Sequence, residues 1–365
     1  MRKKSYLSTK FHIVNMSKAY DVTIGIPVYN EEHYIQRCLD SALNQQFQGI
    51  IEILILDDCG TDTSMNIVRK MKNNHPKGQH IHIISHHENL GVGISRNDII
   101  ENSQGKYLFF LDADDFISSD CIEKLYSHAE THLSEVVYGS GKTVNELGEP
   151  IDIGINYLSQ PHMILYGKDE LASYAFQDTH IHLRDYIVNV LFNRSFILNH
   201  HLSFPKIRFH EDVIFSADLV PVVTKAILLP DQTYRHVIRN NSLSNYQGRT
   251  MISLEEIQQF ISIYTYVKNK NKSLKDKKYY EARCARSMAQ MFFIVCGALK
   301  NRHIIKPHLT NEILRNAMKH PALLKEILRF RKFRSTNLLY YLLGIMPNSL
   351  SVATIFIIAK IKHIL

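Results

Sequence analysis

The sequence contains 365 residues, of which 45% are hydrophobic and 21% are charged, and its formal net charge at pH 7 is +8. A chain of this length and composition can bury one large core or two smaller ones, so it is neither disordered nor fibrous. The charge is unevenly distributed, because residues 251–365 hold 20 Lys and Arg against 6 Asp and Glu, whereas residues 1–250 hold 23 against 29.

This asymmetry predicts different partners for the two parts of the chain. An acidic front part suits a cation and phosphate site, and a basic, apolar rear part suits an anionic surface such as the inner leaflet of a membrane. We expect no nucleic-acid partner, because the sequence shows no nucleic-acid-binding motif and no basic platform interleaved with aromatic residues. The composition does not indicate an oligomeric state.

Cysteine usage and the N-terminal sequence indicate the compartment. The cysteines are odd in number and widely spaced, which argues against a disulfide framework. They are Cys38, Cys59, Cys121, Cys284 and Cys296. Basic residues at positions 2–4 are not followed by an apolar run long enough for a signal peptide. We therefore expect a cytoplasmic location with reduced thiols.

The chain begins with a polar, irregular stretch, residues 1–20, which we interpret as a lead-in. An apolar, β-branched run at residues 22–28 predicts a strand, and apolar residues at helical spacing from position 35 to position 43 predict a helix. Asn30 fits the N-cap of this helix, with two acidic residues in its first turn.

Three further strands are predicted at residues 50–56, 81–84 and 107–111, and polar residues follow each of them. A helix is predicted after the second strand and another after the third. This alternation predicts an α/β fold with a Rossmann-like, mostly parallel sheet flanked by helices and a ligand crevice at the carboxyl ends of its strands. A dinucleotide-binding dehydrogenase is excluded, because residues 27–30 (PVYN) stand where GxGxxG would be required.

Residues 106–116, KYLFFLDADDF, are the most informative stretch. An apolar run typical of a strand buried on both faces ends in Asp112, Asp114 and Asp115. Crowded carboxylates favour a cation, and Mg²⁺ and Mn²⁺ take oxygen ligands that they share with substrate phosphates. If the strand continues, Asp112 and Asp114 project to the same side, so that one can reach a metal and the other a nucleotide. The alternative is an acidic turn that caps a helix beginning near Ser118.

The rest of the chain contains a second acidic pair and a basic, helical end. Residues 145–180 lack periodicity, and we interpret them as a variable region. An apolar segment at residues 188–196 precedes the acidic pair Glu211 and Asp212. Helices are predicted beyond residue 250.

The C-terminal segment, residues 325–365, combines a cationic patch with an apolar run. Residues 325–334 (KEILRFRKFR) are densely basic, and residues 335–359 contain no charged residue but are interrupted at Pro347. This pattern predicts peripheral membrane contact through short apolar segments and nearby lysines. The alternative is that the apolar residues pack on the globular body or on another subunit.

Four motifs occur in order along the first part of the chain: GIPVYNEEHYIQRCLDSALNQQ, EILILDDCGTD, ENLGVGISRN and YLFFLDADD. In this order and spacing they resemble the nucleotide-diphosphosugar-binding half of family 2 glycosyltransferases with the GT-A fold. The resemblance implies a transferase domain at residues 21–250, divided into a nucleotide-sugar-binding half (21–120) and an acceptor half (121–250). In the acceptor half, the variable region 145–180 would face the acceptor, the acidic pair would begin a helix, and residues 233–239 would form a strand. Residues 251–365 would then form a helical extension.

The resemblance also implies roles for the residues that match the family motifs. Pro27, Tyr29 and Glu31 would lie around the nucleobase of the donor, and Asp57 and Asp58 would bind the imide of that base. Arg96 would contact the base or the diphosphate. Asp112, Ala113 and Asp114 would form the DxD motif that binds the ribose and the metal. Taken singly, these residues have ordinary alternatives, such as an ion pair of Arg96 with Asp98 or Glu101 on one helix face.

In the second half, Asp212 matches the catalytic base of the family, with Glu211 as its neighbour. A sugar hydroxyl is a poor nucleophile until a carboxylate within hydrogen-bond reach takes its proton. The alternative is that both acids only favour a helix N-terminus. Further candidates are Arg235 and Arg239, which could offset diphosphate charge, and His236, which could be a third metal ligand.

The resemblance implies an inverting enzyme that moves a sugar from a nucleotide-diphosphate donor, expected to be a UDP-sugar, with Mn²⁺ or Mg²⁺ as cofactor. The acceptor would be a hydroxyl of a glycan or a lipid-linked glycan, assembled into surface polysaccharide at the inner face of the cell membrane. One alternative is a sugar-nucleotide-forming nucleotidyltransferase, which should carry a Gly-rich basic loop where residues 27–32 are acidic. The other is a nucleotide-sugar-binding protein without turnover.

Overall fold

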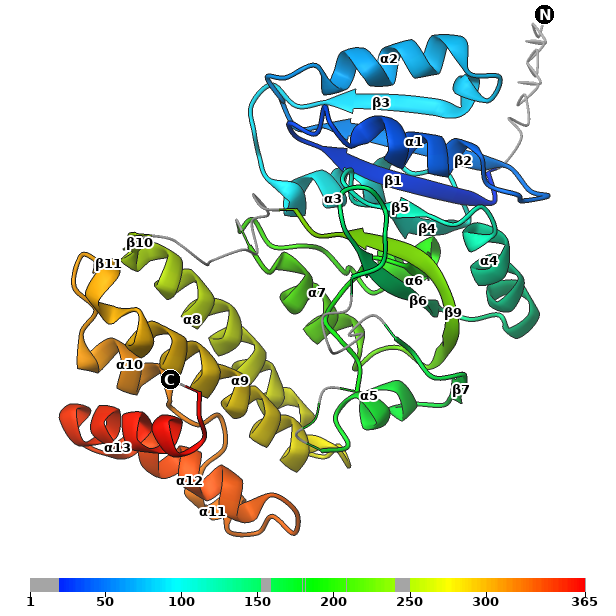
Figure 1. Ribbon diagram of the computed structural model, residues 1–365. Coiled ribbons are helices and arrows are strands. Elements are labelled where there is room, and N and C mark those ends of the chain that lie inside the picture. Colours follow the sequence, from blue (N-terminus) through cyan, green and yellow to red (C-terminus); the bar gives the residue numbers. More distant parts are fainter. Residues whose placement is uncertain are drawn as a thin grey trace, which may run out of the picture.

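The structure is a computed structural model that describes residues 20–151, 159–178, 180, 182–207, 209–239 and 250–364. The expected lead-in therefore lies outside the described residues except for Tyr20, as do residues 152–158 of the region expected to face the acceptor. A mixed sheet lies beside a separate group of C-terminal helices (Figure 1).

Within the described residues, the sheet has nine strands. Their bounds are β1 Val22–Val28, β2 Ile51–Asp57, β3 Ile81–Ser85, β4 Tyr107–Phe110, β5 Phe116–Ile117, β6 Val136–Val144, β7 Met163–Tyr166, β8 Val190–Asn193 and β9 Lys225–Val237. The order is β3-β2-β1-β4-β8-β6-β9-β5, with β7 also paired to β9. Strands β3, β2, β1 and β4 are parallel to one another, whereas β8 is antiparallel to both of its neighbours. The α/β prediction is confirmed, and the parallel part of the sheet coincides with the four strands predicted from the sequence.

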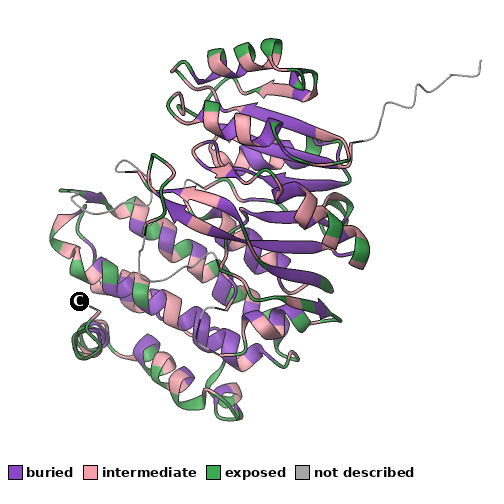
Figure 2. Cartoon of the chain, turned by 45° about the vertical axis from the view of Figure 1, so that its right-hand side comes forward, coloured by how far each residue is buried: buried purple, intermediate pink, exposed green. Residues whose placement is uncertain are grey.

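Helices cover both faces of this sheet. The first face carries α1 Ile35–Leu43, α2 Ser64–Asn74 and α4 Cys121–His132, and the other carries α3 Val92–Asn102, α5 Glu170–Ala175, α6 Arg194–Asn199 and α7 Glu211–Leu219. Alternate residues of β4 enter the two cores, with Tyr107 and Phe109 on one side and Leu108 and Phe110 on the other. Figure 2 shows these strands as largely buried, while the outer helix faces are exposed.

Two local predictions are wrong. Helix α1 begins at Ile35, and Asn30 does not cap it. Instead Asn30 adopts a positive φ of 56°, and its Oδ1 accepts hydrogen bonds from the amides of Thr61 and Asp62. Strand β4 ends at Phe110, so Asp112 to Asp115 form a turn that is closed by a 3.0 Å hydrogen bond from the Asp115 amide to the Asp112 carbonyl. The argument that Asp112 and Asp114 share one face of a strand therefore does not apply.

Beyond residue 250 the chain is mainly helical, as predicted. The elements are β10 Ile252–Ser253, α8 Leu254–Lys270, α9 Tyr280–Lys300, β11 Ile305–Lys306, α10 Asn311–Ala317, α11 Leu324–Ile327, α12 Arg334–Ile345 and α13 Asn348–Ile361, with 3-10 turns at Asn271–Leu274 and Arg302–Ile304. A further 3-10 turn, Gly78–His80, precedes β3 in the sheet domain. Strands β10 and β11 pair in parallel as a separate ribbon. Helix α8 also packs against α7, which joins the helical group to the sheet domain.

The apolar C-terminal run folds into α12 and α13. Leu343, Val352, Ile355 and Ala359 are buried in a core shared with α9 and α10, so part of this run packs on the body of the protein. Within the described ranges, no helix combines the length and apolar character that crossing a bilayer requires.

Candidate active site

The acidic turn after β4 lies at the carboxyl edge of the parallel strands, because β4 pairs with β1 in parallel and the Leu111 amide donates to the Gly25 carbonyl. Asp115 is 1% exposed and anchors this turn to β9. It accepts hydrogen bonds from the Tyr234 hydroxyl at 2.6 Å and the Val237 amide at 2.8 Å. With Asp115 fixed in this way, the two preceding acids are held at the edge of the sheet.

Arg239, which follows β9, joins the acidic turn to the loop after β1. Its guanidinium donates to both carboxylate oxygens of Glu31, at 2.7 and 2.8 Å, and lies 2.9 Å from Asp114 Oδ2. A bidentate arginine–carboxylate pair fixes orientation as well as distance. Glu31, Asp114 and Arg239, which the sequence analysis named as separate candidates, therefore form one cluster.

Arg96 on α3 makes the corresponding link to α7. Its side chain is buried, with Nη2 2.7 Å from Asp112 Oδ1 and Nη1 bonded to Glu211 Oε1. The structure thus does not use Asp98 or Glu101, the ordinary partners on its own helix. The acids after β4 and the acidic pair that begins α7 are within reach of one guanidinium.

The backbone at the start of α3 lies close to the backbone of the segment that precedes α7. Gly91, just before the helix, has a φ of +90°, a conformation that side chains rarely adopt. A Cβ at Gly93 would lie only 2.6 Å from the Pro205 carbonyl oxygen. These two glycines therefore allow α3 to begin against the segment that leads to α7.

Asp212 lies in the first turn of α7, and its Oδ1 accepts the Val213 amide at 2.9 Å. Burial and the charge of Glu211 raise its pKa to about 8, although Arg96 acts in the opposite direction. Burial and the charge of Asp115 likewise raise the pKa of Asp114 to about 8, partly offset by Arg239. Strongly perturbed carboxyl groups at the edge of a parallel sheet are typical of a functional site.

The residues of the acidic turn suit a hard divalent cation in their chemistry. Asp112 and Asp114 offer carboxylate oxygens, and the raised pKa of Asp114 reflects negative charge that a cation would offset. Within the part of the chain that the structure describes, no three His, Cys, Asp or Glu side chains converge as a preformed metal site. A cation would therefore need further oxygen ligands, such as substrate phosphates. The His236 ring contacts Asp115, with Nδ1 at 3.3 Å.

Asp58 is buried and already engaged by protein groups. It accepts the amides of Leu90 and Gly91 at 2.9 Å, and His86 Nδ1 lies 2.7 Å from it. The other ring nitrogen of His86 lies 2.7 Å from Asp98. Asp58 thus ties the loop before α3 to the end of β2. Sequence reasoning missed His86, although its position just after β3, at the same edge of the sheet, is a signal.

The other candidate residues differ in their exposure and in their contacts. Asp57 makes long contacts to the Ser85 hydroxyl and the Gly60 amide, both at 3.3 Å. Tyr29 is 47% exposed, Pro27 is half-buried and Ala113 is buried within the turn. The guanidinium of Arg235 bonds to backbone carbonyls of its own strand, and the structure does not bring it to the acids.

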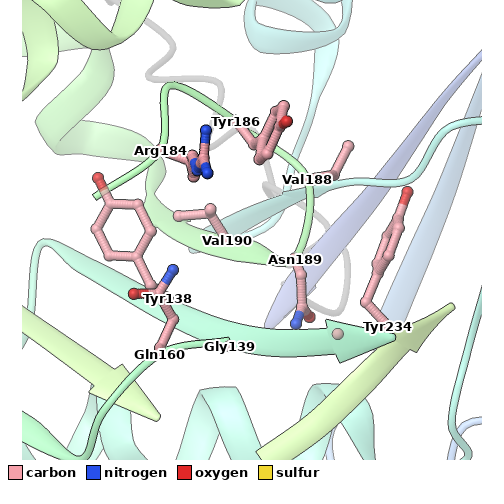
Figure 3. Close-up of a pocket in the computed structure, with 10 residues that line it drawn as sticks. Tyr138, Gly139, Gln160, Arg184, Tyr186, Val188, Asn189, Val190 and Tyr234 are labelled. Atoms are coloured by element: carbon pink, nitrogen blue, oxygen red, sulfur yellow. The ribbon is translucent and has the colours of Figure 1, made fainter. Parts of the chain in front are cut away.

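A pocket beside the acidic turn is lined by residues of β6, β8, β9 and the segment before β8 (Figure 3). It has a volume of about 20 Å³ and is open to solvent. Tyr234 is part of its wall and also bonds Asp115, so the pocket and the acidic turn share a side chain. Gln160 also lines it, and the Gln160 Oε1 atom is buried without a hydrogen-bond partner among the described residues. The pocket is therefore polar, and its volume suits a single water-sized group.

Comparison with known proteins gives consistent results. Residues 23–187 match the family described as Glycosyl transferase family 2. The chain is 28% identical over 223 residues to a poly(ribitol-phosphate) beta-glucosyltransferase of Bacillus spizizenii, covering 60% of this chain and 32% of that protein. It is 32% identical over 200 residues to the putative glycosyltransferase EpsH of Bacillus subtilis, covering 53% of this chain and 54% of EpsH. The chain thus spans about half or less of the length of these curated relatives.

Among solved structures, S. aureus TarS residues 1–349 in complex with UDP superimpose with a TM-score of 0.62 at 17% identity, covering 89% of this chain and 90% of that one. At this identity the similarity concerns the fold.

Proposed function

Because the chain belongs through residues 23–187 to glycosyl transferase family 2, a family of transferases, we propose that it moves a sugar from a UDP-sugar to a hydroxyl of a glycan or lipid-linked acceptor, with inversion at the anomeric carbon. The family and the enzyme class predicted from the four motifs are confirmed. Relatives named for a polymer-modifying glucosyltransferase support a role in polysaccharide biosynthesis. The assignment of residues 21–250 to the transferase and 251–365 to an extension stays a prediction.

The donor would lie over the carboxyl edge of β1, β2 and β4. Glu31, held by Arg239, and Asp58, held by His86, border the side where the nucleobase is expected. Asp112 and Asp114 face the diphosphate and would hold Mn²⁺ or Mg²⁺, which supplies positive charge against the leaving group. His236 remains a predicted third ligand. The complex of TarS with UDP supports a UDP-sugar as donor class.

Asp212 would act as the general base. A base works best when its pKa lies near the working pH, and burial beside Glu211 raises the pKa of Asp212 to about 8. Arg96 fixes the position of Glu211 relative to Asp112, so the residue that receives the acceptor proton and the residues that hold the donor are linked. Attack from the face opposite the leaving diphosphate would invert the anomeric centre.

We also propose that the C-terminal helices contact the inner face of the cell membrane. Apolar side chains of α12 and α13 that are exposed to solvent support this: Leu339, Leu342, Ile345, Leu350, Phe356, Ile357 and Ile361. Exposed cations accompany them at Arg331, Lys332, Arg334 and Lys360. An apolar surface combined with a basic patch is the usual requirement for reversible binding to anionic lipid.

The observation that carries the proposal is the pair of contacts of Arg96, which joins Asp112 and Glu211 across two halves of the fold. A thermal-shift panel of nucleotides and nucleotide sugars, with and without Mn²⁺, tests the donor site, because a ligand that binds only the native state raises its stability. We expect UDP and one UDP-sugar to stabilise the protein with Mn²⁺ present, and Asp114→Asn to abolish this effect.

Arg235→Met provides the matched control and should leave the UDP response unchanged, because among the described residues this guanidinium bonds carbonyls of its own strand and none of the acids. Failure of every nucleotide to stabilise the wild-type protein, or an undiminished response of Asp114→Asn, would overturn the donor site.

A further inference from the structure

Two buried arginines lie on one face of α9, away from the donor edge. Arg283 and Arg286 are one helical turn apart and only 1% and 3% exposed. Both guanidinium groups lie against the ring of Phe176, at 4.5 and 5.2 Å from its centroid. Arginine is rarely buried to this extent unless an acidic group pairs with it.

The hydrogen-bond partners of both side chains are neutral. Arg283 donates to the Asn271 side chain at 2.7 Å and to the Ala217 carbonyl at 3.1 Å, while Arg286 donates to the carbonyls of Ala175 and Leu183. The Nη1 atom of Arg283 is buried and has no partner among the described residues.

Negative charge near the pair is smaller than the positive charge there. Asp185 is the carboxylate that acts on both arginines, but it makes no ion pair within 4 Å with either of them in the described part of the chain. Asp178 also acts on Arg286, but Arg184 adds a third guanidinium group, so three arginines face two carboxylates and a positive charge remains. Such a charge is costly unless a counter-ion or a full set of hydrogen bonds accompanies it.

The same two arginines line a pocket between α7, α8 and α9. It has a volume of about 20 Å³ and opens to solvent. Its apolar walls are formed by Val213, Ala217 and Val267, and its polar members include Ser287, Gln290 and the carboxylate of Asp185. A buried N–H donor without a partner and a surplus of positive charge, in a pocket open to solvent, are what a small anion requires.

We propose that this pocket binds a small inorganic anion, chloride or phosphate, through Arg283 and Arg286. The bound anion would take the hydrogen bond that Arg283 Nη1 lacks and neutralise the surplus positive charge. Val213 and Ala217 belong to α7, the helix that begins with Glu211 and Asp212, so an occupied site would fix this helix against α9. The proposal concerns a site distinct from the donor edge and does not depend on the transferase reaction.

The test is a titration of the full chain, without nucleotide or metal, with NaCl and separately with sodium phosphate, each at constant ionic strength maintained by a bulky organic anion. We expect the melting temperature to rise along a saturating curve with one of the two anions, as mass action predicts for a ligand of the native state. Which salt saturates at the lower concentration identifies the occupant.

Arg286→Met should remove the saturating response. Arg194→Met is the matched control, because Arg194 also donates to neutral groups, including two backbone carbonyls, but lies outside this pocket, and it should keep the response. Gln290→Phe provides a second variant that obstructs the pocket and leaves both guanidinium groups in place, so the proposal stays testable if Arg286→Met does not fold.

Crystals soaked in bromide provide a direct measurement, since bromide is located by its anomalous scattering and competes with chloride. Density between the two arginines, together with a saturating response in solution, supports the site. Three results would each overturn the site. They are an equal response to the anion in wild type and Gln290→Phe, a linear response typical of general salt effects, and density that appears at crystal concentration only.

Discussion

Arg96→Met is the substitution that most directly tests how the two halves of the site are joined. Methionine keeps an unbranched side chain but removes the guanidinium that binds Asp112 and Glu211. Removing one partner of a buried ion pair typically costs about 3–5 kcal/mol, because the other charge is left unpaired. The Glu211 side chain is only 8% exposed, but that of Asp112 is 33% exposed, so solvent screens part of its interaction with Arg96. We therefore expect a loss of stability at the lower end of this range, about 3 kcal/mol.

For a chain of this size, a loss of about 3 kcal/mol corresponds to a fall of roughly 6 °C in melting temperature. Thermal melts monitored by circular dichroism at pH 7 measure it. Arg235→Met is the control and should shift the melting temperature by less than about 1 °C, since its guanidinium bonds carbonyls of its own strand. In a double-mutant cycle, Glu211→Gln should be less harmful in the Arg96→Met background than alone, with a coupling of about 0.5–3 kcal/mol. Additive effects, or an Arg96→Met melt that matches wild type, would refute the reasoning.

Three further substitutions test other parts of the structure. Tyr234→Phe removes the hydroxyl that donates to buried Asp115 and should cost about 1–3 kcal/mol in thermal melts, whereas wild-type stability would show that the acidic turn is held by other contacts. Gly93→Ala places a Cβ 2.6 Å from the Pro205 carbonyl oxygen and should destabilise the protein by about 1–3 kcal/mol, and a neutral result in the same assay would contradict the close approach of α3. Burial lowers the pKa of Lys268 to about 8, below its ordinary value of 10.5, so between these pH values the unfolded chain binds more protons than the native one. Between pH 8 and pH 10.5, the free energy of unfolding of the wild type should therefore rise by about 3 kcal/mol relative to that of Lys268→Met, as measured by denaturant titrations. If the free energies of the two proteins change with pH in parallel, the pKa of Lys268 is not shifted.

Much of the first half of the fold could be predicted from sequence because its strands are parallel and buried on both faces. The run at residues 22–28 coincides with β1, and the helical spacing from Ile35 coincides with α1. The carboxyl ends of parallel strands meet at one edge, so residues placed just after different strands were expected to converge. The structure brings together Glu31, Asp112 and Asp114 in this way, within reach of Arg96 and Arg239.

Which side chains bond to each other could not be predicted, because the partners are distant in sequence. Arg239 binds Glu31 across 208 positions, and Tyr234 binds Asp115 across 119. Two-residue periodicity also fails once a strand ends, which is why the strand argument for Asp112 and Asp114 was wrong. In this turn the last acid, Asp115, points into the protein as an anchor, and only the long strand β9 supplies its partners.

The C-terminal segment shows a different limit of sequence reasoning. An apolar run without charge is compatible with a membrane contact and with a packed core. In the structure Leu343 and Ile355 are buried against α9 and α10, whereas Leu342 and Phe356 of the same two helices are exposed. Because the run divides into two short helices at Pro347, each helix has one face for the core and one for another surface.

The carboxylate of Asp212 is the group on which the proposed transfer depends most. Its most direct test is to measure donor turnover by Asp212→Asn at saturating Mn²⁺, with the UDP-sugar that the thermal-shift panel identifies. Asparagine keeps the shape of the side chain but cannot take a proton, so turnover should fall by about 10²–10⁴-fold while UDP binding is unchanged. The wild-type rate should rise with pH through about 8, because the base acts only when deprotonated, and the variant should lack this rise. Turnover by Asp212→Asn within tenfold of wild type, with the same dependence on pH, would contradict the assignment of the base.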